Sequence, residues 1–175
     1  DRSPGEFYQL DMEMAFASQE DVFAVIEDVL PPIFAKYGKY QTASTAPFAR
    51  IAYKEAMDKY GSDKPDLRID LVLQDATACM ADCGFGPFEG QTVKAIVVDK
   101  FNGTRKVIDK LCADVEVQCG HKVYWFRLDE NGELVGGISK FLQERKQQVI
   151  DALGLKNGDF VGLSAGKLLE AQKTA

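Results

Sequence analysis

Three polar side chains that could bind a small ligand alternate with apolar residues near the start of the chain. Gln9, Asp11 and Glu13 stand among the apolar residues Tyr8, Leu10, Met12, Met14 and Phe16. A period of two predicts a β-strand over 8–16, with the amide and both carboxylates on one face, about 7 Å apart along the strand. Such a face suits a small cationic or zwitterionic ligand. The alternative is a half-buried strand with an ordinary solvated face.

The elements that would position this face follow one another along the chain. Ser18 and Asp21 occupy capping-box positions at the start of a helix that Pro31-Pro32 should break or kink. The patterns then predict a loop over 38–47, a helix over 53–60 ending at Gly61, and a charged turn over 61–68.

The second half alternates short elements. The sequence patterns there predict helices over 75–83, 104–117 and 139–153, and strands over 93–98, 122–128 and 160–163. They also predict a hairpin turn at Asn131-Gly132 and a helix from Lys167. Interleaved helices and hairpins indicate the α+β class, with helices covering one face of a mostly antiparallel sheet.

Composition and charge exclude several classes of protein. The chain has 175 residues, 46% hydrophobic and 27% charged, which excludes a disordered polymer, a collagen-like repeat and a coiled coil. No window approaches the roughly 20 apolar residues of a membrane span, so no membrane partner is expected. The start lacks the layout of a signal peptide, so export is not expected either. The net charge of −6 gives no excess of Lys and Arg for non-specific binding to nucleic acid.

The remaining candidate residues favour structural roles. Cys79, Cys83, Cys112 and Cys119 lack the spacing of a zinc site, so reduced, mostly buried thiols and no metal are expected. His121 is the only histidine and has no evident catalytic partner. The aromatic run 124–126 could stack on nucleic-acid bases, but packing in the core and on an apolar patch is favoured.

Two motifs together resemble one enzyme family. EFYQLDME (6–13), preceded by Arg2 and Ser3, resembles the second half of motif 2 of class II aminoacyl-tRNA synthetases in the aspartyl form. GSDKPDLR (61–68) is similar to the segment that bacterial aspartyl-tRNA synthetases carry before their insertion. The chain beyond it resembles that insertion, the GAD domain, which a tRNA-dependent amidotransferase subunit shares.

The resemblance implies a fold and a site. It implies part of a class II antiparallel-sheet catalytic domain over 1–70, an inserted two-layer α/β sandwich over 71–156, and a return to the catalytic domain over 157–175. Asp11 would receive the α-amino group of aspartate, and Gln9 would help to shape that pocket. Arg2 and Ser3 would lie near ATP and the acceptor end of tRNA. No residue of the chain is assigned a catalytic or metal-binding role.

The resemblance also implies an activity. The parent would be a cytoplasmic, homodimeric ligase that uses ATP and Mg²⁺ to attach aspartate to tRNA. The 175 residues include neither motif 1, nor motif 3, nor the motif 2 arginine that grips ATP. We therefore expect an internal fragment that is inactive alone, and that self-associates through exposed sheet edges or has a disordered first segment.

A different class of function stays open. The GAD-like part could be a non-catalytic module that contacts tRNA or a partner protein, although its nearly neutral charge argues against strong RNA affinity. Tight, salt-sensitive tRNA binding by residues 71–153 would favour it. A weaker alternative is an amidotransferase subunit, against which the motif 2 segment argues.

Overall fold

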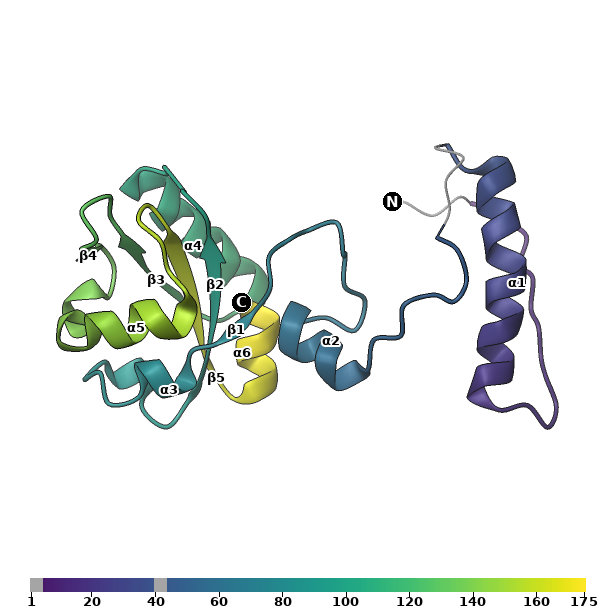
Figure 1. The fold of residues 1–175 in the computed structure, drawn as a ribbon, viewed down its shortest axis with the longest axis horizontal. Coiled ribbons are helices and arrows are strands. Elements are labelled where there is room, and N and C mark those ends of the chain that lie inside the picture. The colour runs from purple at the N-terminus through teal and green to yellow at the C-terminus, as the bar shows by residue number, and fades with distance from the viewer. Residues whose placement is uncertain (1–4, 40–43) are drawn as a thin grey trace. The chain divides into compact units, whose positions relative to one another are not determined.

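The structure, a computed structural model, describes residues 5–39 and 44–175. It contains two compact units, 1–50 and 51–175, and each is described by itself (Figure 1). The described part of the predicted loop over 38–47 contains neither helix nor strand, as expected. None of the helices in the described ranges is long and apolar enough to cross a membrane.

The first unit is built around helix α1, Gln19–Tyr37. Its predicted capping box is confirmed: Ser18 accepts from the Asp21 backbone N–H, and the Asp21 carboxylate accepts from the Ser18 N–H at 2.7 Å. These bonds from Ser18 lower the pKa of Asp21. The break expected at Pro31-Pro32 is wrong, because α1 continues through both to Tyr37. No residue of α1 is buried, so carbonyls left without an amide donor can bond water.

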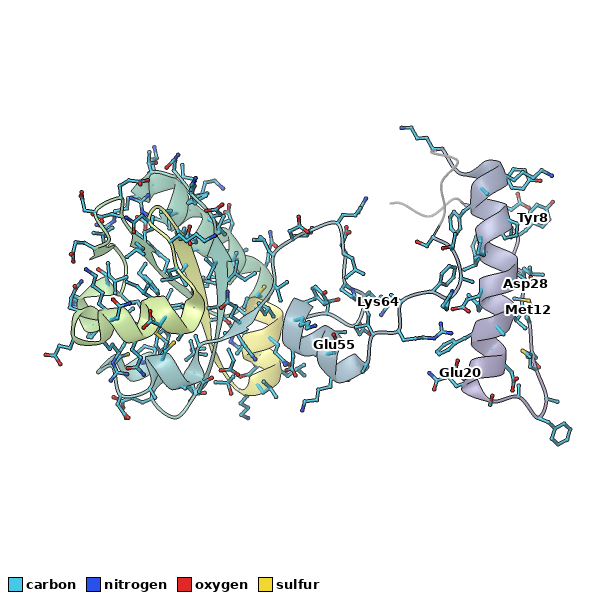
Figure 2. The ribbon with its side chains drawn as sticks, viewed as in Figure 1. Tyr8, Met12, Glu20, Asp28, Glu55 and Lys64 are labelled. Carbon is cyan, nitrogen blue, oxygen red and sulfur yellow. The ribbon has the colours of Figure 1, made fainter. Side chains whose placement is uncertain are left out.

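The strand predicted over 8–16 is also wrong. Among the described residues this segment pairs with no other strand, and its apolar side chains are exposed, Tyr8 and Phe16 fully and Leu10 to 78%. Tyr8 and Met12 both project from it (Figure 2). Alternation predicts which residues share a face, but a strand also needs a partner whose N–H and C=O groups complete its ladder. The described residues of the first unit supply none.

The second unit is a five-stranded antiparallel sheet with helices, which confirms the α+β class. The strand order is β1-β2-β5-β3-β4, and every pair is antiparallel. Its strands are β1 Gln74–Asp75, β2 Thr92–Val98, β3 Val123–Leu128, β4 Leu134–Val135 and β5 Phe160–Gly166. Its α-helices are α2 Tyr53–Tyr60, α3 Thr77–Met80, α4 Arg105–Cys119, α5 Lys146–Leu153 and α6 Leu168–Thr174. Short 3₁₀ helices are η1 Gly86–Phe88, η2 Ser139–Phe141 and η3 Gln143–Arg145.

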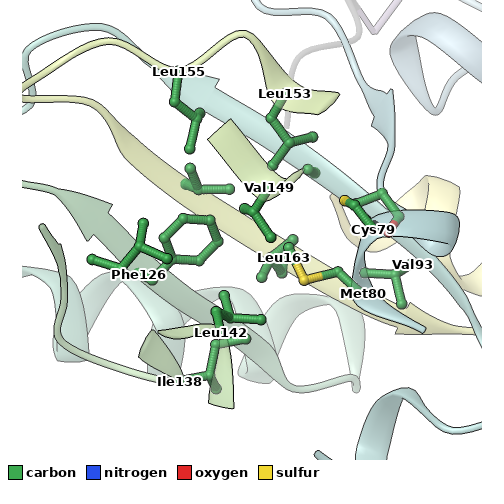
Figure 3. Close-up of a cluster of buried hydrophobic side chains, with 14 of the residues drawn as sticks. Cys79, Met80, Val93, Phe126, Ile138, Leu142, Val149, Leu153, Leu155 and Leu163 are labelled. Atoms are coloured by element: carbon green, nitrogen blue, oxygen red, sulfur yellow. Dashed lines mark hydrogen bonds between the residues drawn. The ribbon is translucent and has the colours of Figure 1, made fainter. Parts of the chain in front are cut away.

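One face of the sheet carries the main hydrophobic core. Phe126 of β3 and Leu163 of β5 pack there with Met80, Leu142 and Val149 from the α3 and α5 side (Figure 3). Side chains alternate along a strand, so Ser164 lies on the opposite face, where its hydroxyl donates to the α6 carbonyl of Ala171 at 2.7 Å. Helices therefore lie on both faces of the sheet, whereas the sequence pattern predicted helices on one.

Two helices predicted from periodicity are shorter than expected. The predicted helix over 139–153 divides into η2, η3 and α5, because the side chains of Gln143 and Arg145 bond carbonyls outside α5. The guanidinium of Arg145 reaches the carbonyls of Cys79, Ala81 and Asp82 beside α3. These tertiary contacts override local helix propensity. The helix predicted over 75–83 is α3 alone, since Asp75 belongs to β1 and Asp82 has a φ of 54°.

The exposed apolar residues of segment 7–16 predict self-association of the 175-residue polypeptide. An extended chain with unpaired backbone groups and exposed apolar side chains pairs readily with a second copy. Sedimentation velocity at rising concentration should show association. Replacing Leu10 and Phe16 by Ser should weaken it, whereas Val117→Ser, at an exposed site on α4, should not. A monodisperse monomer at every concentration would contradict this expectation.

Candidate amino-acid-binding site

The structure brings the two predicted ligand-binding side chains of the first unit together. The Gln9 side-chain Nε2 donates to both carboxylate oxygens of Asp11, at 2.7 Å to Oδ1 and 2.9 Å to Oδ2. Both side chains are exposed. Arg2 and Ser3, predicted near ATP and the tRNA end, lie outside the described residues.

The bonded partner of the Asp11 carboxylate is an uncharged side chain. Within residues 5–39 and 44–175, no ion pair joins Asp11 to a lysine or arginine. Its bonded neighbour is an uncharged amide, which orients a carboxylate without neutralising it. An exposed carboxylate of this kind can accept charge-assisted hydrogen bonds from an ammonium group.

The charged turn over 61–68 is held differently, by ion pairs between its own residues. Lys64 Nζ lies 3.0 Å from Asp63 Oδ2, and the Arg68 guanidinium binds both carboxylate oxygens of Asp66, with Nε to Oδ1 at 2.8 Å. The charged turn predicted over 61–68 is therefore closed by two ion pairs of its own. Hydrogen bonds from the Arg68 side chain and backbone lower the pKa of Asp66 to about 2.

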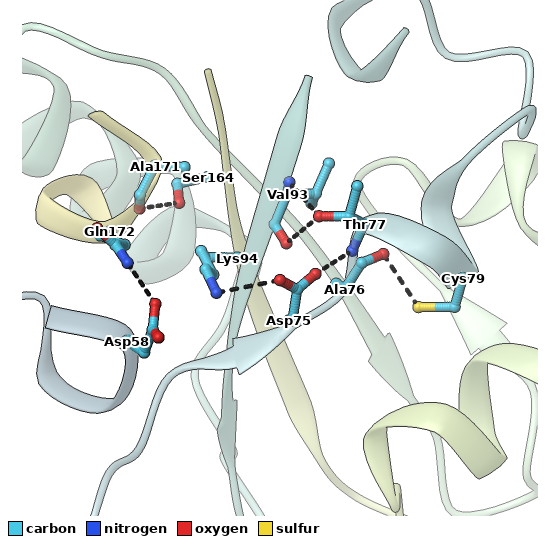
Figure 4. Close-up of polar contacts among 10 residues, drawn as sticks. All are labelled: Asp58, Asp75, Ala76, Thr77, Cys79, Val93, Lys94, Ser164, Ala171 and Gln172. Carbon is cyan, nitrogen blue, oxygen red and sulfur yellow. Dashed lines mark hydrogen bonds and ion pairs between the residues drawn. The ribbon is translucent and has the colours of Figure 1, made fainter. Parts of the chain in front are cut away.

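A joint between α2 and α6, formed by the side chains of Asp58 and Gln172, fixes the start of the charged turn over 61–68. Gln172 of α6 donates to Asp58 of α2 at 2.7 Å, across 114 residues of sequence (Figure 4). Gly61 has a φ of 64°, and a Cβ there would lie 2.2 Å from the Gln172 carbonyl oxygen, so only glycine fits. Sequence reasoning identified Gly61 as a helix cap but missed this joint, because no local pattern pairs Asp58 with Gln172.

A buried lysine lies beside the same joint. Lys94 of β2 is 4% exposed, and its Nζ lies 3.1 Å from Asp75 Oδ2 of β1. Partial burial acts to raise the pKa of Asp75, but hydrogen bonds from Thr77 and Lys94 outweigh it and lower the pKa. The pair therefore fastens the edge strand β1 to the sheet.

Of the aromatic run 124–126, Phe126 lies in the core, and Tyr124 and Trp125 are half-buried against other rings. Phe126 is fully buried, Tyr124 contacts the rings of Phe85 and Phe88 edge-on, and Trp125 stacks on Phe160 with centroids 6.1 Å apart. These rings are not presented as a platform for bases.

The cysteines form no reactive centre. All four are free thiols; Cys79 is buried, Cys83 and Cys112 are partly buried, and Cys119 is exposed. Burial raises the pKa of the Cys79 and Cys112 thiols, which disfavours the nucleophilic thiolate. No cluster of three metal-ligating side chains occurs in the part of the chain that the structure describes.

Comparison with known proteins identifies the family. A model of the tRNA synthetases class II (D, K and N) matches residues 1–161, and the chain belongs to this family. It is 46% identical over 99% of its length to an aspartate–tRNA ligase of Streptomyces avermitilis. It is 43% identical over its whole length to an aspartate–tRNA(Asp/Asn) ligase of Zymomonas mobilis. The chain spans about 30% of the length of these relatives.

The geometry of the charged turn predicts an unusual titration of Asp66. Because the folded chain lowers its pKa from 3.8 to about 2, the stability that this pair contributes is complete above pH 3.8 and is lost as the pH falls through about 2. Carbon-detected NMR titration should give a midpoint near 2 for Asp66. Arg68→Gln should return it towards 3.8, whereas Lys64→Gln, which removes a cation paired with Asp63, should leave it unchanged. An ordinary midpoint before substitution would contradict the ion pair.

Proposed function

We propose that the full-length protein is an ATP-dependent aspartate–tRNA ligase and that these residues supply part of its amino-acid pocket. The observation that carries the proposal is the exposed Asp11 carboxylate, oriented by Gln9 and without a cationic partner in the described ranges. The family match and the names of the relatives support the same activity. Both relatives are named for aspartate, so the proposal concerns the amino acid.

Asp11 binds the α-ammonium group of aspartate in this proposal. A carboxylate and an ammonium form charge-assisted hydrogen bonds, and such a bond is stronger than one between neutral groups. Fixing the ammonium leaves the α-carboxylate of the substrate free to attack the α-phosphorus of ATP with release of pyrophosphate. The ribose hydroxyl at the tRNA end then attacks the aspartyl carbonyl and loses its proton, forming the ester with release of AMP. Arg2 and Ser3 are proposed to lie near ATP and that end.

The described residues do not fit a magnesium site. Mg²⁺ prefers several oxygen ligands around one point, and no such cluster is present in residues 5–39 and 44–175. The proposal therefore places the ATP and Mg²⁺ of the full-length protein on residues other than these. When bound, Mg²⁺ would stabilise negative charge on the phosphates.

The proposal assigns residues 1–70 and 157–175 to the catalytic domain and 71–156 to a GAD insertion. Strand β5 lies within 157–175 and is the central strand of the sheet, between β2 and β3, which lie within 71–156. Residues 71–156 and 157–175 therefore fold as one unit. The proposal also includes tRNA as a partner, a homodimeric full-length protein and a cytoplasmic location.

Removing the charge of Asp11 should weaken aspartate binding in the full-length protein. Asp11→Asn should raise KM for aspartate by about 10- to 100-fold, because a hydrogen bond to a charged group contributes roughly 1.5–3 kcal/mol. KM for ATP should stay constant, and both are measured by ATP–pyrophosphate exchange. Asp28→Asn, at an exposed acid on α1, is the matched control and should change neither. An unchanged KM for aspartate in Asp11→Asn would refute the proposed site.

The 175-residue polypeptide alone should form no aspartyl-adenylate. In-line displacement at phosphorus requires cationic groups around the phosphates, and the resemblance assigns those groups to motifs that the 175 residues do not include. Aspartate-dependent pyrophosphate exchange by the purified polypeptide is the measurement, with the full-length protein as the positive control. Exchange above background by the polypeptide would contradict this expectation.

A further inference from the structure

We infer that Gln9 is a positioning residue, which orients the Asp11 carboxylate for the substrate ammonium and does not bind the substrate itself. This role rests on the proposed function of Asp11. It gives different roles to Gln9 and Asp11, which the motif alone places on one ligand-binding face. The observation is the paired contact from one Gln9 nitrogen to both oxygens of Asp11, at 2.7 and 2.9 Å.

The contact orders a side chain that nothing else in the described ranges holds. Asp11 is exposed, and its side chain bonds only Gln9 there. An exposed carboxylate without a partner samples several rotamers, and a ligand must then offset the lost freedom. One donor that reaches both oxygens fixes the carboxylate before the ligand arrives, which lowers the cost of binding.

An amide suits this role better than a cation would. In the turn over 61–68, Arg68 both orients and neutralises Asp66. Gln9 orients Asp11 but adds no charge, so the carboxylate remains a full counter-ion for an ammonium. Because a carboxylate offers about four lone-pair sites, the contact with Gln9 leaves acceptor capacity for the ligand.

One N–H of the Gln9 amide is already committed to Asp11. Its Nε2 lies within hydrogen-bond distance of both carboxylate oxygens, and the second N–H of the amide points away from them. That N–H and the acceptor Oε1 could contact a substrate directly. Positioning and direct contact therefore make different predictions when Asp11 is changed.

A double-mutant cycle in the full-length protein separates the two roles. Gln9→Met keeps the length of the side chain and removes the amide. It should raise KM for aspartate about fivefold, because the ligand must then order the Asp11 side chain itself, with kcat and KM for ATP little changed. In the Asp11→Asn background the same substitution should add less than about twofold, since residues that act as a unit are not additive. Gln19→Met, at an exposed position of α1, is the matched control.

Each other outcome has a distinct meaning. An equal effect of Gln9→Met in both backgrounds would show direct substrate contact and overturn the positioning role. No effect of Gln9→Met, while Asp11→Asn still raises KM for aspartate, would overturn that role and leave the proposed function standing. No effect of Asp11→Asn would remove the proposed function itself, and the positioning role with it. Thermal unfolding of each variant excludes a folding defect, which is not expected at exposed positions.

Discussion

Strand β5 is the element on which the whole second unit depends, because it is paired on both sides. β2 and β3 flank it, with Leu163 opposite Ala95 on one side and Tyr124 on the other. Its alternating side chains send Leu163 into the core below α5 and Ser164 towards α6. One strand thus fixes the positions of both helical layers. Since β5 lies close to the C-terminal end of the chain, the sheet is complete only when nearly all of the second unit is present.

The aspartate side chains of this protein have two kinds of bonding partner, cationic and uncharged. Asp63 and Asp66 are neutralised by neighbouring cations, and Asp75 is paired with the buried Lys94. Those three carboxylates are structural, since their charge is already used within the protein. Asp11 is bonded instead to the uncharged amide of Gln9. The partner of a carboxylate is therefore a better guide to its role than its exposure, because Asp66 is also on the surface.

Much of the second unit could be predicted from local sequence. β2, β3 and α4 lie within two residues of their predicted bounds, because β-branched runs and a Thr cap are strong local signals. The division of 139–153 into three short helices was not predictable, because the carbonyls that Arg145 bonds are more than 60 residues away in sequence. The strand over 8–16 failed for the complementary reason: the pattern was present, but a paired neighbour was not.

For the candidate site, the sequence by itself determined the residue types, their alternation, and the family motifs that contain Gln9, Asp11 and the turn over 61–68. These are local properties, fixed by side-chain chemistry and spacing. Only the tertiary structure decided that Gln172 closes the joint with Asp58 and that helices lie on both faces of the sheet. Those outcomes depend on which groups meet in space, and that is set by the packing of the whole chain.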